Sequence, residues 1–183
     1  TGIKTGSTPE AGYCLASAAT KDGRNLIAVV LGAENPKNAD GSTNRLQFSE
    51  SSRLLEWGFD NFSRQTILDE TVYPAEVKVT LSKEASSVAV HPNGTLEACL
   101  PNDLDPSTFD LDWTLDADTV EAPVEEGQVM GSITVSYNGT EYGTLDLVAI
   151  ESVDRSELLY RLDRLEKFFD QLWVKILLVV IIV

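Results

Sequence analysis

The chain has 183 residues, of which 43% are hydrophobic, enough to build packed cores, so a disordered protein is excluded as the default. Its formal net charge of -15 excludes a protein that follows nucleic-acid phosphates, because such proteins need clustered Lys and Arg. We therefore expect no nucleic-acid partner, and we interpret the acidity as a solvated surface.

Residues 1–64 are predicted to hold antiparallel strands and one helix. Strands are expected at residues 13–18 and 26–31, joined by a turn at Lys21-Asp22-Gly23. The unbroken apolar run of the second strand is typical of a strand covered on both faces. After a polar loop, a helix is expected from about Arg45 to Phe62, with a packing face of Leu55, Phe59 and Phe62.

Residues 65–153 change to short alternating runs, such as 77–81 and 132–137, and predict a small all-β domain. Asn93-Gly94 and Asn138-Gly139 favour type I′ hairpin turns, because both central residues of that turn need positive φ. Four acidic residues are interpreted as a solvated loop, since EF-hand spacing is lacking. These residues are Asp103, Asp105, Asp110 and Asp112.

Residues 154–183 predict a helix that starts at Asp154 or Ser156 and associates with a membrane. Its apolar face would carry Leu158, Leu162, Leu165, Phe169, Leu172 and Ile176. The apolar stretch from Leu172 covers about 18 Å as helix, short of the roughly 30 Å hydrocarbon core. The helix therefore either lies in the membrane interface or is part of a spanning segment, and a core helix is the structural alternative.

Cysteine and histidine usage limits the available chemistry. Cys14 and Cys99 lie far apart in apolar strand-like runs, so we expect buried thiols and no disulfide. His91 precedes a Pro-Asn-Gly turn signal and is expected at the surface. This usage argues against a metal site and a Ser-His-Asp triad, and no cofactor is implied.

The segment that carries chemistry is Lys4-Thr5-Gly6, inside the extended run 2–8. Alone, the tripeptide is a weak signal. Together with Ala11-Gly12-Tyr13-Cys14-Leu15, the strand that ends at Gly32, and Leu54-Leu55-Glu56-Trp57-Gly58-Phe59, it resembles the serine-type D-alanyl-D-alanine carboxypeptidases, the low-molecular-mass penicillin-binding proteins. The resemblance runs through the β domain and the C-terminal helix.

This resemblance implies roles for five residues. Lys4 would place a positive charge beside the nucleophile and near the terminal carboxylate of the substrate, and Thr5 would donate to that carboxylate. Gly6 would let the substrate approach the backbone, and the Ser7 backbone N–H would be an oxyanion donor. Arg45 would help to hold the carboxylate, with an exposed arginine at a helix start as the alternative reading.

The resemblance also implies the fold and the partners. We expect an α+β chain: the C-terminal remnant of a transpeptidase or β-lactamase-like domain, then the β domain and the helix. The substrate would be the peptidoglycan stem peptide, β-lactams would be covalent inhibitors of the full-length enzyme, and the site would face the outside of the bacterial cell membrane.

Two of the family's catalytic elements are not supplied by the chain. No Ser-x-x-Lys occurs in residues 1–183, and we find nothing that supplies the family's Ser-x-Asn element. The chain alone is therefore expected to be an inactive fragment of an enzyme. The alternative is a non-catalytic, membrane-tethered β module.

Overall fold

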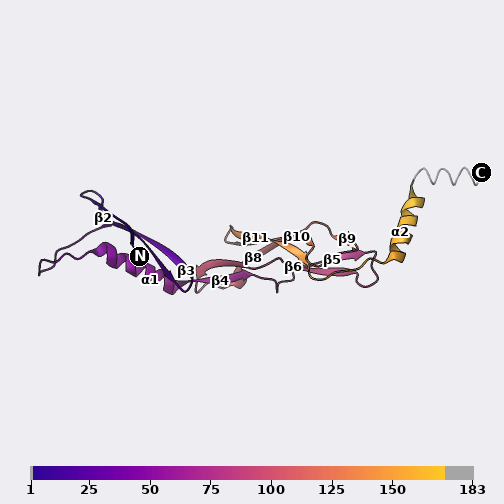
Figure 1. Cartoon of the computed structure of the whole chain (residues 1–183), viewed down its shortest axis with the longest axis horizontal. Coiled ribbons are helices and arrows are strands. Elements are labelled where there is room, and N and C mark those ends of the chain that lie inside the picture. Colours follow the sequence, from indigo (N-terminus) through magenta and orange to yellow (C-terminus); the bar gives the residue numbers. More distant parts are fainter. Residues whose placement is uncertain (1, 172–183) are drawn as a thin grey trace, which may run out of the picture. The chain divides into compact units, whose positions relative to one another are not determined.

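The computed structural model describes residues 2–171 and contains two compact units (Figure 1). The first unit runs up to Gln65 and includes Ala98–Asp105, and the second holds Thr66–Glu97 and the chain from Pro106. The structure is a sheet-rich α+β protein, as expected. The predicted boundaries at residues 64 and 153 stay predictions.

The first unit is built on a three-stranded antiparallel sheet in the order β1-β2-β3. Its strands are β1 (Gly2–Thr8), β2 (Gly12–Lys21) and β3 (Arg24–Ala33). The predicted turn between β2 and β3 is confirmed, because Asp22 and Gly23 both have positive φ, 52° and 73°, between paired Lys21 and Arg24. β1 has a partner on one side only, so it forms an edge of the sheet.

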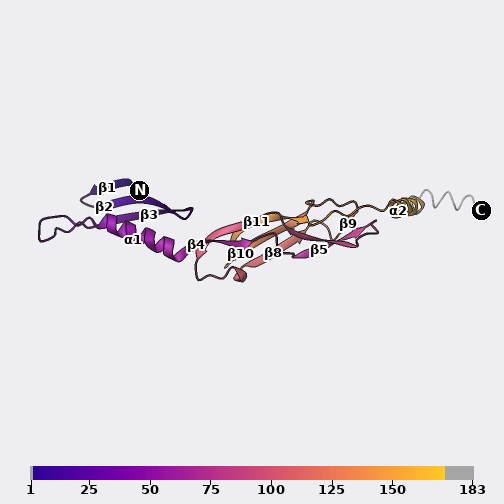
Figure 2. The same ribbon diagram turned by 60° about the horizontal axis from the view of Figure 1, so that its bottom comes forward.

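Helix α1 (Leu46–Asn61) runs along one face of this sheet (Figure 2), and Arg45 and Phe62 are its cap residues. The predicted helix limits are therefore confirmed. The predicted packing face is only partly right: Phe59 is buried, but the other buried residues of α1 are polar, Gln47 and Ser51. The Ser51 hydroxyl makes a short hydrogen bond with the Ser17 hydroxyl on β2.

The C-terminal end of α1 is held by Arg24 of β3. Its guanidinium donates to the carbonyl oxygens of Phe59 and Phe62 and lies 5.3 Å from the centre of the Phe59 ring. The last carbonyls of a helix lack intrahelical donors and carry partial negative charge, so a cation there is favourable. The β2–β3 hairpin and the end of the helix are thus tied together.

The opposite face of β3 is open in this chain, so a strand whose apolar run is typical of cover on both faces is covered here on one face only. Ile27 is 73% exposed, Val29 58% and Leu31 74%, whereas Ala28, between them, is buried under α1. Alternation of side chains along a strand explains the pattern, because α1 covers one face only. An apolar run makes a strand suitable for burial on both faces. It does not show whether a second layer packs on the other face.

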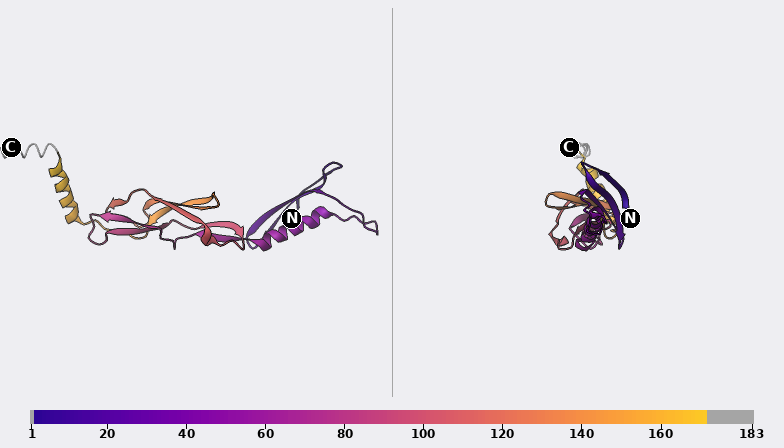
Figure 3. Two further views of the ribbon diagram at one scale, coloured as in Figure 1. Left: turned by 180° about the vertical axis from the view of Figure 1, so that it is seen from behind. Right: turned by 90° about the vertical axis from the view of Figure 1, so that its left-hand side faces the viewer.

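The second unit is a six-stranded sheet in the order β8-β10-β11-β6-β5-β9 (Figure 3). All of its pairings are antiparallel except β5–β9. The strands are β5 (Ala75–Thr80), β6 (Ser87–Pro92), β8 (Asp110–Leu115), β9 (Thr119–Glu121), β10 (Val129–Tyr137) and β11 (Thr140–Ala149). A short helix, η1 (Pro106–Thr108), precedes β8, and β4 (Phe62–Leu68) and β7 (Leu96–Pro101) form a separate two-stranded sheet.

The alternation predicted for residues 132–137 appears in β10. Ile133 and Val135 are fully buried, while Ser132 and Thr134 between them are partly exposed. The Asn138-Gly139 turn is confirmed as well, with φ of 49° and 75° between paired Tyr137 and Thr140.

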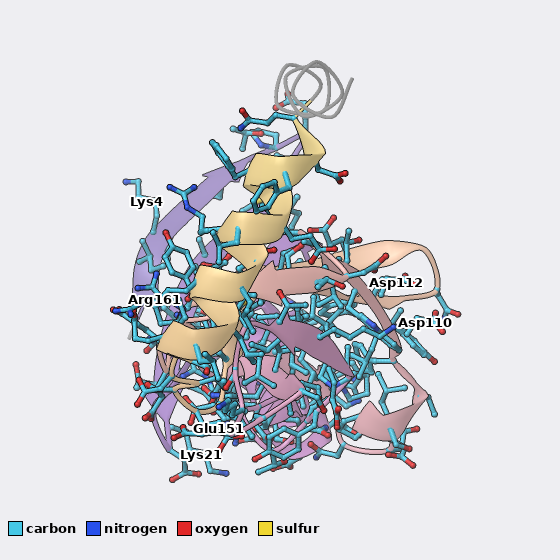
Figure 4. The ribbon with its side chains drawn as sticks, turned by 90° about the vertical axis from the view of Figure 1, so that its right-hand side faces the viewer. Lys4, Lys21, Asp110, Asp112, Glu151 and Arg161 are labelled. Atoms are coloured by element: carbon cyan, nitrogen blue, oxygen red, sulfur yellow. The ribbon has the colours of Figure 1, made fainter. Side chains whose placement is uncertain are left out.

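Three local expectations are wrong. Asn93-Gly94 does not close a hairpin, because β6 and β7 belong to different sheets and, of the two residues, only Gly94 has positive φ. Asp110 and Asp112 lie on edge strand β8 rather than in a loop, and both extend outward in Figure 4. Cys99 is exposed and Cys14 is only half-buried, and both are free thiols.

Helix α2 (Glu157–Asp170) begins at Ser156, whose hydroxyl accepts the Leu159 N–H, so the cap predicted there is confirmed. None of its residues is buried. Lys167 donates to Asp163 and to Glu121 of β9, and these hydrogen bonds raise its pKa, with Asp163 contributing most. In the described part of the chain no helix has the length and apolar content to cross a bilayer. The predicted continuation through Leu172 and Ile176 lies outside the described residues.

Two valines of β10 test the assignment of the core. Val135→Ala should lower the free energy of unfolding by about 2 kcal/mol, because it removes buried methyl groups and leaves a cavity. Val129→Ala is the control, since Val129 is 49% exposed on the same strand, against 0% for Val135. Urea denaturation followed by circular dichroism measures both, and equal losses would contradict this core.

Candidate functional site

Four of the five predicted site residues, Lys4 to Ser7, lie on edge strand β1, where every residue from Ile3 to Thr8 is exposed. Lys4 pairs with Ala16 of β2, which pairs with Val29 of β3. Paired side chains share a face, so Lys4 lies on the open face with Val29 and extends away from the sheet in Figure 4. No ion pair or hydrogen bond of its ammonium group occurs within residues 2–171.

Thr5 and Ser7 alternate with Lys4 and therefore lie on the face of α1. On this face a cavity of ≈ 580 Å³ opens between β1, β2, the β3–α1 loop and the start of α1. It is lined by Thr5, Gly6, Ser7, Tyr13, Cys14, Asn35, Thr43, Arg45, Gln47 and Phe48. The structure thus brings Thr5, Gly6, Ser7 and Arg45 together and leaves Lys4 on the other side of the strand.

The lining of this cavity favours an anion. Arg45 is its one charged residue, and no Asp or Glu lines it, although the whole chain has a net charge of -15. Among the described residues, the side chains of Thr5, Ser7 and Arg45 have no hydrogen-bond or ion-pair partner. A guanidinium group and two hydroxyl groups are therefore free to donate to a carboxylate.

The loop before α1 forms one wall of the cavity and is held by its own polar contacts. The Asn35 side-chain oxygen accepts the Leu46 N–H at 3.2 Å, at the start of the helix. Asp40 accepts the hydroxyl and backbone N–H of Ser42 at 2.6 and 2.8 Å, and these bonds lower the pKa of Asp40, the hydroxyl contributing most.

A literal Ser-x-Asn tripeptide does occur in this loop, Ser42-Thr43-Asn44. Its Ser42 hydroxyl donates to Asp40 and accepts from Asn38, so it closes the loop. Only Thr43 of the three residues lines the cavity. The tripeptide therefore does not supply the missing catalytic element.

The sequence analysis did not identify six of the lining residues: Tyr13, Cys14, Asn35, Thr43, Gln47 and Phe48. The pairing of Ser7 with Tyr13 and of Gly6 with Cys14 places these two residues here, which the hairpin pattern alone could have indicated. The other four belong to the loop and the first turn of α1, where no motif marks them. Within residues 2–171, no group of three His, Cys, Asp or Glu residues could hold a metal ion.

Comparison with known proteins shows similarity to one class of enzyme. Residues 1–35 match the family model of D-alanyl-D-alanine carboxypeptidases, and residues 69–155 match the C-terminal domain of penicillin-binding protein 5. The resemblance drawn from Lys4-Thr5-Gly6 is confirmed: two segments of the chain are similar to D-alanyl-D-alanine carboxypeptidases and to penicillin-binding protein 5.

Individual relatives agree with this assignment. The chain is 35% identical over 162 residues to the D-alanyl-D-alanine carboxypeptidase DacC of Escherichia coli and 30% identical over 161 residues to DacA of that organism. These matches cover 84% and 83% of this chain but only 36% and 35% of the relatives. The chain thus spans about a third of their length.

Solved structures of the same class are also similar. Penicillin-binding protein 5 of Haemophilus influenzae matches with 27% identity and a TM-score of 0.48, over 84% of this chain and 42% of that one.

Arg45, the N-cap residue of α1, and Arg53, within the helix, test the anion site. In the full-length product of the reading frame that encodes this chain, Arg45→Gln should weaken the binding of a peptide with a free C-terminal carboxylate about tenfold or more, because a charge-assisted hydrogen bond to the carboxylate is lost. Arg53→Gln is the matched control, since Arg53 is 74% exposed and paired with Glu50 on the same helix. Equal effects of the two substitutions would remove Arg45 from the site.

Proposed function

We propose that this chain is the C-terminal part of a serine-type D-alanyl-D-alanine carboxypeptidase that removes the terminal D-alanine from peptidoglycan stem peptides. The observation that carries the proposal is the edge strand β1, on which Thr5, Gly6 and Ser7 border a cavity with an unpaired Arg45 and no carboxylate, while Lys4 lies on the opposite face. The names of the matched relatives support the same reaction.

In this reaction a serine outside residues 1–183 attacks the carbonyl of the penultimate D-alanine, the terminal D-alanine leaves, and water hydrolyses the acyl-enzyme. Arg45 and the Thr5 hydroxyl hold the free carboxylate, which selects the C-terminal end of a peptide. The Ser7 backbone N–H donates to the oxyanion, and Gly6 presents no side chain to the approaching substrate.

Lys4 has a different task, because it lies on the face of β1 opposite the cavity. A substrate that runs antiparallel along the free edge of β1 would border both faces. Its carboxylate would reach the cavity. The ammonium group of Lys4 would lie on the open face, where its positive charge stabilises negative charge that develops near the nucleophile. The apolar residues of that open face would then be covered by the part of the enzyme that carries the serine.

Labelling with a fluorescent penicillin tests this proposal. The full-length product should form a covalent adduct, and Lys4→Ala should slow its formation at least about a hundredfold, the scale of a lost electrostatic contribution to a transition state. Lys21→Ala is the control, an exposed lysine at the far end of β2. The 183-residue chain alone should not be labelled.

The outcomes of this experiment separate the two candidate functions. Labelling that survives Lys4→Ala at the normal rate would remove Lys4 from catalysis. Complete lack of labelling in the full-length product would leave the alternative, a non-catalytic, membrane-tethered β module.

We also propose that α2 holds the protein at the extracytoplasmic face of the bacterial cell membrane. Five large apolar residues of α2 are 45–55% exposed: Leu158, Leu162, Leu165, Phe168 and Phe169. Leu158, Leu162, Leu165 and Phe169 recur at helical spacing and form one stripe, and charged residues of both signs occupy the rest of the helix. A helix with such a stripe lies in the plane of a membrane surface, with the stripe buried at the boundary of the acyl chains.

Sedimentation with phosphatidylglycerol-containing vesicles measures this association. The double substitution Leu162→Glu and Leu165→Glu should reduce the bound fraction severalfold, because it places two charges in the apolar stripe. Glu166→Gln, which removes a negative charge beside the stripe, should bind at least as well as the unchanged chain. Unchanged binding of the double variant would show that α2 is not the membrane contact.

A further inference from the structure

The three buried polar side chains of the described chain lie together in the first unit. Gln47 and Ser51 are one turn apart on α1 and are 6% and 3% exposed, and Ser17 on β2 is 6% exposed. The Ser17 hydroxyl contacts both the Ser51 hydroxyl and the Ala28 carbonyl oxygen. A short polar row therefore leads from the cavity, which Gln47 lines, into the interface between α1 and the sheet.

Gln47 differs from its two neighbours because its hydrogen bonding is incomplete. Its side-chain oxygen Oε1 is the one buried side-chain oxygen or nitrogen atom without a hydrogen-bond partner in residues 2–171. Leaving a buried acceptor unsatisfied costs about 1–3 kcal/mol. A leucine at this position would avoid that cost, so the fold of α1 gives no reason for an amide here.

The cavity offers such a reason. The last torsion angle of a glutamine is broad, so the amide can turn and present its oxygen to the cavity without moving α1. Carbonyl oxygens accept from N–H groups and not from carboxylates. The free donors Arg45, Thr5 and Ser7 suit the carboxylate, and Gln47 supplies an acceptor beside them for an N–H of the same ligand.

We propose that the side-chain oxygen of Gln47 accepts a hydrogen bond from the peptide N–H of the substrate's terminal residue. This inference rests on the proposed carboxypeptidase function, since the carboxylate held by Arg45 and Thr5 is one Cα atom away from that N–H. The Gln47 amide turns when the peptide enters, its Oε1 accepts the scissile N–H, and the buried oxygen gains the partner that it lacks in the empty cavity.

The test compares an amide with an ester. An acyl-D-alanyl-D-alanine peptide has this N–H, and the matching acyl-D-alanyl-D-lactate ester has an oxygen in its place and the same carboxylate. In the full-length enzyme, Gln47→Leu should lower kcat/KM for the amide relative to the ester about five- to tenfold, the effect of one net hydrogen bond. The melting temperature should not fall.

Two further variants separate binding from structure. Ser51→Ala disturbs the same helix–sheet interface without lining the cavity, so it should leave the amide-to-ester ratio unchanged. Gln47→Glu should weaken both substrates, because its charge repels their common carboxylate.

An equal loss on both substrates in Gln47→Leu would overturn the inference while leaving the carboxypeptidase function intact. Failure of the unchanged enzyme to cleave either substrate or to react with penicillin would instead overturn the proposed function.

Discussion

The first unit depends on how α1 sits on the three-stranded sheet. A single helix covers Leu15, Ser17 and Ala28, and it does so with a polar contact between Ser17 and Ser51 where most interfaces have only apolar side chains. Because hydrogen bonds are directional, this contact restricts the register of the helix more than apolar packing would. The register in turn places Arg45 in the lining of the cavity beside β1.

The two faces of β1 have separate roles. Alternation along the strand directs Thr5 and Ser7 to the cavity and Lys4 to the open face, so adjacent residues in the sequence serve opposite sides of the sheet. A ligand that runs along the unpaired edge can contact both. Many proteins must protect an edge strand from chance pairing, whereas under the proposed function this edge strand is the element that a peptide substrate extends.

Much of this arrangement could be predicted from the sequence. The Lys-Thr-Gly strand, the Asp22-Gly23 turn and the limits of α1 all follow from local patterns. The burial of Gln47 at the site could not be predicted, because a hydrophobicity pattern assigns a polar residue in the first turn of a helix to the solvated face. The open face of β3 could be predicted only by treating the chain as part of a larger enzyme, since an apolar run does not say which layer covers it. Cys99 was wrongly placed in a core, and its position on an edge strand leaves it exposed.

The contact of Arg24 with the end of α1 also has a consequence for how the first unit forms. The hairpin residue that follows Asp22-Gly23 satisfies carbonyls at Phe59 and Phe62, about 35 residues later in the chain. The hairpin is local and can close early, whereas the helix end gains its donors only after the hairpin is in place. Amide hydrogen exchange at the tip of the hairpin and in the last turn of α1 would then report one shared opening event.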